Sequence, residues 1–252
     1  MARLDQNMKQ GSLGKGFKYT GTRLEHLGAT EYTLVTVALD DTGSVSPFAT
    51  QLLEMLKTAV KACKKSPRSD NILVRVVRFS TSYAGNIDEV HGFKPLSLID
   101  PDVDYVVSSP SGGTPLYDAA YSVLGATNAY AKDLVDQEFG VNAIVFIVTD
   151  GGDTGSIATK KMVRDESKVA TQGETLESMI SVLIGINTSQ PSLLTLLTEF
   201  KDDAELTHFI DAADVTSGNL AKLAQFVSRS VSSQSQAMGT GGPSQNVSSV
   251  IF

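Results

Sequence analysis

A carboxylate and two hydroxyl groups occur at every second position in the stretch LDDTGS, as Asp40, Thr42 and Ser44. The residues before them, 34–39, read LVTVAL, a run of small, β-branched and aliphatic side chains that is typical of a strand buried on both faces. In open α/β sheets, ligands bind beyond the carboxyl ends of the strands. Because hard cations prefer oxygen ligands, this spacing predicts a site for a cation such as Mg²⁺.

Two later stretches place further oxygen ligands at strand ends or helix starts. Thr114 lies in a loop rich in serine and glycine, residues 108–115, just before a helix that we predict over 115–135. Asp150 follows AIVFIVT, residues 143–149, which is the most apolar strand pattern in the chain, and two glycines follow it. Glycines allow such loops to bend closely around one ion.

Hydrophobic periodicity predicts strands and helices in nearly strict alternation. Strands are expected at residues 32–39, 72–79, 143–149, 178–186 and 208–211. Helices are expected at residues 47–64, 115–135, 157–170, from 190 onward and around 220–231. Parallel strands need crossover connections, which helices supply, so we predict an α/β fold with a doubly wound, mostly parallel sheet flanked by helices and one antiparallel edge strand.

Some segments are less clearly patterned. Residues 83–93 are either a short edge strand or a loop, and the two arginines within 72–79 suggest a strand less enclosed than the first. Residues 1–30 are interpreted as an N-terminal extension with a strand or hairpin near 17–27. The main domain then covers 31–231. Residues 232–252, rich in serine, glutamine and glycine, are interpreted as a tail, whose apolar Val-Ile-Phe end is either docked or frayed.

Composition narrows the functional classes. A net charge of −7 and a pI near 5.0 argue against a nucleic-acid surface and against binding to anionic membranes. The single cysteine, Cys63, cannot form an internal disulfide and is expected to be a buried, inert thiol. No apolar run has the length of a signal peptide core or of a membrane span. We therefore expect a cytoplasmic protein.

The three stretches LVTVALDDTGS, SGGTPLYDA and VFIVTDGGD, in this order, resemble the metal-ion-dependent adhesion site (MIDAS) of von Willebrand factor type A (vWA) domains. The resemblance covers roughly residues 30–231. It implies a vWA fold and a bound Mg²⁺, with Mn²⁺ or Ca²⁺ as alternatives. It further implies that Thr42 and Ser44 are direct ligands, that Thr114 binds directly or through water, and that Asp40 and Asp150 act mainly through water and hydrogen bonds.

Each residue also has a simpler interpretation. Asp40 alone would be explained as a turn or cap residue, and only the whole set favours a metal site. Asp41 fills a variable position of the motif and is assigned no ligand role. Asp118 is explained by the dipole of the helix in whose first turn it lies, and Asp153 by solvation. The three histidines show no ligand spacing and are expected to be structural.

Three functions remain open. The first is a non-enzymatic interaction module whose Mg²⁺ binds an Asp or Glu carboxylate of a partner protein; intracellular domains resembling this one often work beside AAA+ ATPases of the MoxR type. The second is a structural subunit of a larger assembly that uses its terminal segments. The third is a phosphotransferase of the haloacid dehalogenase type with Asp40 as nucleophile, which the threonine at position 42, where that family needs a second aspartate, disfavours.

Overall fold

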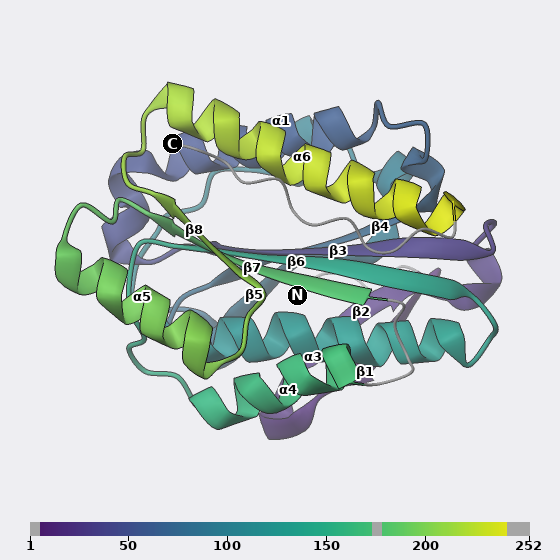
Figure 1. Cartoon of the computed structure of the whole chain (residues 1–252), viewed down its shortest axis with the longest axis horizontal. Helices are drawn as coiled ribbons and strands as arrows, with labels where there is room; N and C mark the ends of the chain where they lie inside the picture. Colours follow the sequence, from purple (N-terminus) through teal and green to yellow (C-terminus); the bar gives the residue numbers. More distant parts are fainter. Residues whose placement is uncertain (1–5, 173–177, 241–252) are drawn as a thin grey trace.

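One sheet runs through the middle of the molecule, with helices on both faces (Figure 1). The computed structural model describes residues 6–172 and 178–240, and within them the sheet has eight strands in the order β1-β2-β5-β4-β3-β6-β7-β8. The strands are β1 (Met8–Ser12), β2 (Lys18–Thr22), β3 (Glu31–Asp40), β4 (Ile72–Phe79), β5 (Ile87–Pro95), β6 (Gly140–Thr149), β7 (Ser178–Ile186) and β8 (His208–Ala212).

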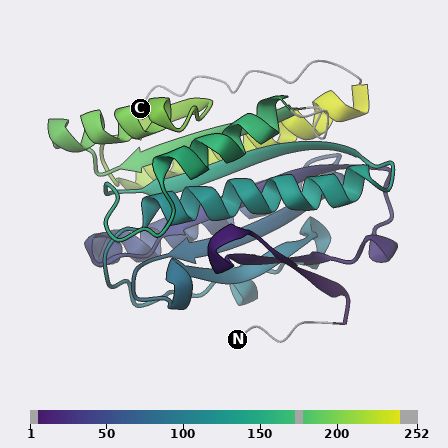
Figure 2. The same ribbon diagram turned by 90° about the horizontal axis from the view of Figure 1, so that it is seen from below.

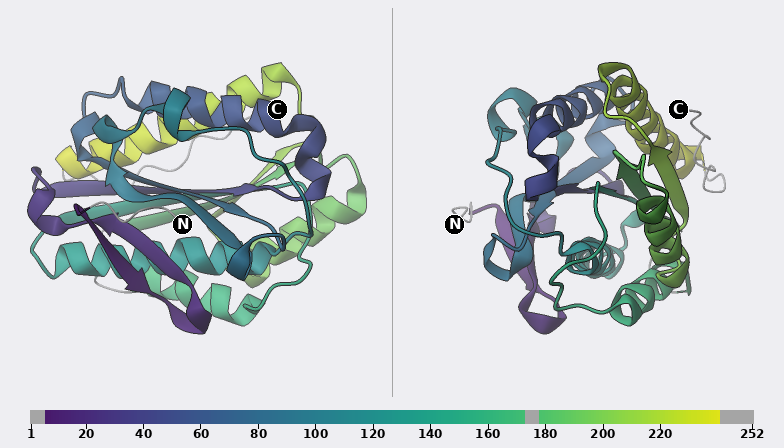
Figure 3. Two further views of the ribbon diagram at one scale, coloured as in Figure 1. Left: turned by 180° about the vertical axis from the view of Figure 1, so that it is seen from behind. Right: turned by 90° about the vertical axis from the view of Figure 1, so that its left-hand side faces the viewer.

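The helices form two layers (Figure 3). They are α1 (Ala49–Cys63), α2 (Pro101–Asp104), α3 (Leu116–Val135), α4 (Lys160–Gln172), α5 (Pro191–Asp203) and α6 (Ser217–Thr240). Helices α1 and α6 share a core with one face of the sheet, and α3, α4 and α5 share a second core with the other face. Each central strand therefore contributes to two cores, which explains its continuous apolar pattern. None of the described helices is long and apolar enough to cross a membrane.

Strand pairing confirms the predicted fold class. β3 lies in the centre and pairs in parallel with β4 and β6, and β7 and β8 continue the parallel array. The β4–β5 and β1–β2 pairs are antiparallel. Residues 83–93, expected as an edge strand or a loop, contain most of β5, which lies inside the sheet because β2 pairs beyond it.

The hairpin of β1 and β2 brings the expected N-terminal extension into this sheet (Figure 2). It lies earlier in the chain than the predicted 17–27. β2 meets β5 where Gly21 pairs with Phe93. A Cβ atom at Gly21 would lie 2.6 Å from the ring of Tyr130 in α3, so this close approach requires glycine.

Helix α6 continues beyond its predicted end. The serine- and glutamine-rich composition placed the start of a tail at residue 232, but the helix runs to Thr240. Gln234 is buried, and its carbonyl oxygen accepts a 2.7 Å hydrogen bond from Nδ2 of Asn142 in β6. The predicted start of the tail is therefore wrong, because packing rather than composition decides where this helix ends. Residues 241–252, with the Val-Ile-Phe end, lie outside the described residues.

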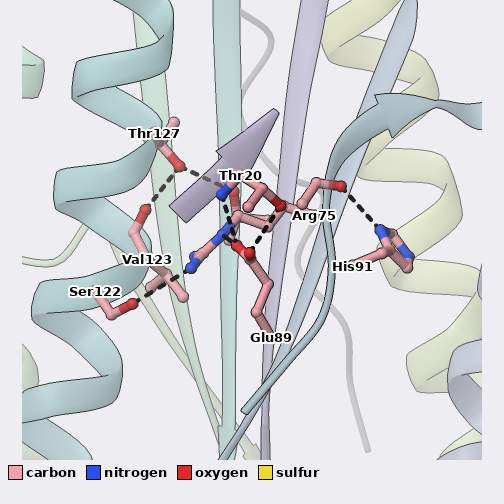
Figure 4. Close-up of polar contacts among 9 residues, drawn as sticks. Thr20, Arg75, Glu89, His91, Ser122, Val123 and Thr127 are labelled. Carbon is pink, nitrogen blue, oxygen red and sulfur yellow. Dashed lines mark hydrogen bonds and ion pairs between the residues drawn. The ribbon is translucent and has the colours of Figure 1, made fainter. Parts of the chain in front are cut away.

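Arg75 of β4 is fully buried, so the expectation of a less enclosed strand is wrong. Its Nε donates to Oε1 of Glu89 in β5 at 2.7 Å, and its Nη2 donates to Oγ of Ser122 in α3 at 3.5 Å (Figure 4). Glu89 also accepts hydrogen bonds from the amide and the hydroxyl of Thr20, at 3.2 and 2.8 Å. This ion pair compensates the buried charge and ties the hairpin to the sheet.

Glu89→Gln would leave Arg75 buried without its counter-charge. Since breaking a buried pair is costly, we expect the free energy of unfolding in urea to fall by about 3 kcal/mol. The matched control is Asp88→Asn, which breaks the more exposed Arg78–Asp88 pair (23% and 37% exposed) and is expected to cost less than about 1 kcal/mol. Equal losses in the two variants would contradict this assignment.

His91 of β5 is a buried structural histidine, as expected. Burial lowers its pKa to about 4. Its Nδ1 donates to the carbonyl oxygen of Gly92 at 3.0 Å, and its Nε2 lies 2.9 Å from the hydroxyl of Tyr105. A neutral ring satisfies both contacts.

The depressed pKa predicts an acid-sensitive contribution to stability. The unfolded chain takes up a proton on His91 near pH 6.5, whereas the folded chain does so only near pH 4. The contribution is therefore complete above pH 6.5 and is lost between pH 6.5 and 4, by roughly 3 kcal/mol. Urea denaturation across this range should show a steeper loss for the wild type than for His91→Gln, while His26→Gln, at an exposed position, should follow the wild type.

Candidate metal centre

Asp40 ends β3 and holds the turns around it. Its Oδ1 accepts a 3.0 Å hydrogen bond from the amide of Thr42, and its Oδ2 accepts a 2.6 Å hydrogen bond from the hydroxyl of Thr149 at the end of β6. The side chain is buried. Asp40 therefore joins the carboxyl ends of two adjacent parallel strands.

Three of the predicted ligands form a continuous chain of contacts. The hydroxyl oxygens of Thr42 and Ser44 lie 3.1 Å apart, and the Ser44 hydroxyl donates to Oδ1 of Asp150 at 2.8 Å. Asp150 is more than a hundred positions away in the chain, so only the parallel alignment of β3 and β6 brings these oxygens together.

Thr114 lies against the same place from a third loop. A Cβ atom at Gly151, the residue after Asp150, would lie 3.0 Å from the Thr114 hydroxyl oxygen. The Thr114 backbone is fixed by Thr154, whose hydroxyl accepts from its amide and whose amide donates to its carbonyl oxygen, both at 2.7 Å. Within the described residues the Thr114 hydroxyl makes no hydrogen bond, so it is available to a ligand.

The electrostatics of Asp40 and Asp150 favour a cation beside them. Burial raises the pKa of Asp40 to about 6, hydrogen bonds from Thr149 and Thr42 lower it, and the Asp150 charge raises it. Burial also raises the pKa of Asp150. No lysine or arginine in the described ranges forms an ion pair with either carboxylate. A positive charge would relieve both shifts.

The donor set fits a hard cation held mainly by hydroxyl groups. The described part of the chain contains no group of three or more His, Cys, Asp or Glu side chains placed to hold a metal ion. Soft metals that need thiolate or imidazole ligands are therefore poor candidates here, whereas hydroxyl and carboxylate oxygens suit Mg²⁺. The role of the five residues as ligands stays a prediction.

Asp41, which the motif left without a role, anchors the surrounding loops. Its side chain is buried and accepts hydrogen bonds from the hydroxyls of Tyr83 and Ser108. Burial and the bond to Asp41 raise the pKa of Tyr83. The Asp41 carbonyl oxygen also accepts from the amide of Ser111 at 3.1 Å. Asp41 thus fixes the loop that leads to Thr114.

Asp118 and Asp153 hold the loop between β6 and α4, and both simpler interpretations are incomplete. Asp118 is fully buried, and its carboxylate accepts from the amides of Ile157 at 2.9 Å and Ala158 at 2.6 Å and from Nδ2 of Asn86 at 2.7 Å. Asp153 accepts from the amide of Tyr117 at 3.0 Å and so is not merely solvated. The backbone partners of Asp118, Ile157 and Ala158, are about forty positions away in the chain, so no local pattern could reveal this role.

Solved structures with a similar fold identify the architecture of this chain. The pilus adhesin SpaC from Lactobacillus rhamnosus GG, in its open conformation, matches 90% of this chain with a TM-score of 0.59 at 10% identity. Proximal thread matrix protein 1 (PTMP1) from the mussel byssus matches 81% with a TM-score of 0.54 at 19% identity. The chain has a vWA fold.

The vWA likeness covers only part of these proteins. The chain spans 32% of the SpaC chain and 47% of the PTMP1 chain, about a third to a half of their lengths. A further PTMP1 structure, at 18% identity and a TM-score of 0.51, is described with a zinc-occupied MIDAS motif. Searches against family models and against curated sequences find no match.

The network of Asp118 can be tested by exchanging charges. In Asp118→Asn a side-chain amide would face the amide of Asn86, so we expect the free energy of unfolding to fall by about 2 kcal/mol and the amides of Ile157 and Ala158 to lose protection from hydrogen exchange. Adding Asn86→Asp restores a donor–acceptor pair and should recover part of the loss. Asp165→Asn, at an exposed position on α4, should change neither quantity. No recovery in the double variant would contradict the pairing.

Proposed function

We propose that this chain is a non-enzymatic interaction module with a MIDAS-like site for a divalent cation. Thr42 and Ser44 would hold the cation directly, Thr114 directly or through water, and Asp40 and Asp150 mainly through water and hydrogen bonds. The observation that carries the proposal is the chain of contacts from Thr42 through Ser44 to Asp150, between loops distant in sequence. When bound, the cation would supply a charge that attracts a carboxylate of a partner protein.

The residues favour recognition because most of the proposed direct ligands are neutral. Hydroxyl groups leave much of the charge of a cation uncompensated, so an incoming Asp or Glu gains a strong charge-assisted contact. Asp40 and Asp150 supply the negative charge of the site, and hydrogen bonds already engage both oxygens of Asp40. We place Mg²⁺ first because every donor is a hard oxygen, with Mn²⁺ or Ca²⁺ as alternatives.

The geometry also argues against the phosphotransferase alternative. A nucleophilic aspartate needs an oxygen free to attack, but Asp40 is only 4% exposed, and its two oxygens accept hydrogen bonds from the amide of Thr42 and the hydroxyl of Thr149. Thr42 occupies the position at which that class needs a general acid. A threonine hydroxyl is a far weaker proton donor than a carboxylic acid.

The partner we propose is a protein that presents an acidic side chain, either an assembly subunit or an AAA+ ATPase of the MoxR type. The names of the solved structures describe a pilus adhesin and a thread matrix protein of the mussel byssus. The structural-subunit alternative is therefore compatible with the metal site. A cytoplasmic location stays a prediction.

Cation binding can be measured directly. We expect Mg²⁺ to raise the melting temperature over that in EDTA, since a ligand at a hundred times its Kd stabilises a fold by about 2.7 kcal/mol. Ser44→Ala should weaken Mg²⁺ binding in calorimetry by at least about tenfold. Ser109→Ala, which removes an exposed hydroxyl from a neighbouring loop, should bind like the wild type. Equal Mg²⁺ affinity in the two variants would overturn the assignment.

A further inference from the structure

Two exposed valines lie beside the candidate metal centre. Val106 and Val107 are 61% and 56% exposed, although both are large apolar side chains. A small pocket is lined by both of them together with Asp40, Asp41 and Ser108, which places the valines next to Asp40, one of the predicted ligands. The connection after α2 runs along the outside of the molecule to the edge where α1 begins (Figure 3). We call residues 105–108 the valine segment.

The valine segment is held at both ends. Tyr105 is 2% exposed, and its hydroxyl contacts Nε2 of His91 at 2.9 Å. At the other end the Ser108 hydroxyl donates to the Asp41 carboxylate. Because Tyr105 and the acceptor Asp41 are both buried, the valines between these two attachments cannot retract into the core. Their exposure is therefore built into the fold.

The backbone of the valine segment is also available. Tyr105 has an extended backbone conformation. Within the described ranges, the amides and carbonyl groups of Val106 and Val107 make no hydrogen bond. An exposed stretch of unpaired backbone can bind a second extended chain by main-chain hydrogen bonds, while neighbouring side chains provide selectivity.

A third apolar side chain borders the centre from another loop. Leu196 of α5 is 43% exposed, and a Cβ atom at Gly152 would lie 2.5 Å from its Cδ2. Gly152 is two residues after Asp150. Exposed apolar side chains therefore lie beside two of the loops that carry predicted ligands, with Val106 and Val107 next to Asp40 and Leu196 next to the glycines that follow Asp150.

We propose that the valine segment and Leu196 are the flanks of a docking surface for an extended segment of a partner protein, in which an Asp or Glu is bordered by apolar residues. This inference rests on the proposed function, because the acidic residue would meet the cation. The charge of a cation selects the acid, and the exposed apolar side chains select its neighbours. Burial of the valines then adds affinity that the cation alone cannot provide.

The chemistry of the surface favours a partner over the chain's own C-terminal residues. Residues 241–252 read GGPSQNVSSVIF and contain no Asp or Glu side chain, so they could fill the apolar flank but could not present an acidic side chain to the cation. A second copy of the chain could supply an acid, and sedimentation in Mg²⁺ and in EDTA would detect it. A Mg²⁺-dependent dimer that Val106→Ser/Val107→Ser abolishes would overturn the proposal of a distinct partner.

A random twelve-residue peptide library tests the proposal without a known partner. The library is selected on the immobilised full chain in Mg²⁺ and eluted with EDTA. We expect the eluted sequences to be enriched in Asp or Glu flanked by apolar residues. On the Val106→Ser/Val107→Ser variant we expect acidic residues to remain enriched and the apolar preference to be lost on one side of the acidic residue, since Leu196 is unchanged. The most enriched peptide should bind this variant about tenfold more weakly than the wild type, which corresponds to about 1.4 kcal/mol.

The control for surface hydrophobicity is Val169→Ser, which removes an exposed valine from α4 and should leave both selection and affinity unchanged. Acidic enrichment without apolar flanks on the wild type would overturn the docking surface and leave the metal-dependent function intact. If the EDTA eluate from the wild type contains no enriched acidic peptide, the result contradicts both the docking surface and the proposed metal-dependent function. A matching loss in Val169→Ser would assign the effect to general hydrophobicity and so overturn the docking surface. Unchanged Mg²⁺ affinity of the double variant shows that the centre itself is preserved.

Discussion

Asp40 and Asp150, which form no ion pair with a lysine or arginine in the part of the chain that the structure describes, impose the constraint around which the carboxyl edge of the sheet is built. Burial raises the pKa of both, so their charged forms are costly unless donors surround them. The amide of Thr42 and the hydroxyls of Thr149 and Ser44 are those donors. They offset part of the cost and, in doing so, fix the loops after β3 and β6 against each other. The charge that these neutral donors leave uncompensated is what a cation could use.

The buried ion pair in the sheet shows the opposite solution to the same problem. Arg75 and Glu89 compensate each other, and Thr20 and Ser122 satisfy further atoms of the pair, so this cluster has little charge left to offer a ligand. It serves to hold the N-terminal hairpin on the sheet. The two clusters therefore differ in one respect: the Arg75–Glu89 cluster contains its own counter-charge, and the cluster around Asp40 and Asp150 does not within the described residues. This difference distinguishes a structural polar cluster from a candidate binding site in this protein.

The sequence predicted those parts of the structure that depend on local periodicity. The central strands bury both faces, so their apolar runs stand out, and the residues at their ends could be aligned by assuming parallel pairing. Features that depend on distant partners were missed. Arg75 suggested exposure because its partner Glu89 lies in a segment without a clear pattern, and Asp118 looked like an ordinary helix-start acid. The end of α6 was missed because Gln234 is buried against Asn142, which composition alone cannot indicate.

The same anchoring that assembles the candidate centre also keeps its surroundings exposed. Asp41 fixes Ser108 and Ser111, so the loop that carries Thr114 is held in place and the valines before it remain outside the core. A fold gains stability by burying valine side chains, and two that are pinned in solvent forgo that gain. The lost stabilisation is explained if the exposed valines form a binding surface. Side chains and loops that are already ordered before binding lose less conformational entropy when the complex forms. The proposed hydroxyl ligands and the exposed valines are thus two consequences of one set of loop anchors. Both favour recognition of another chain over chemistry on a small molecule.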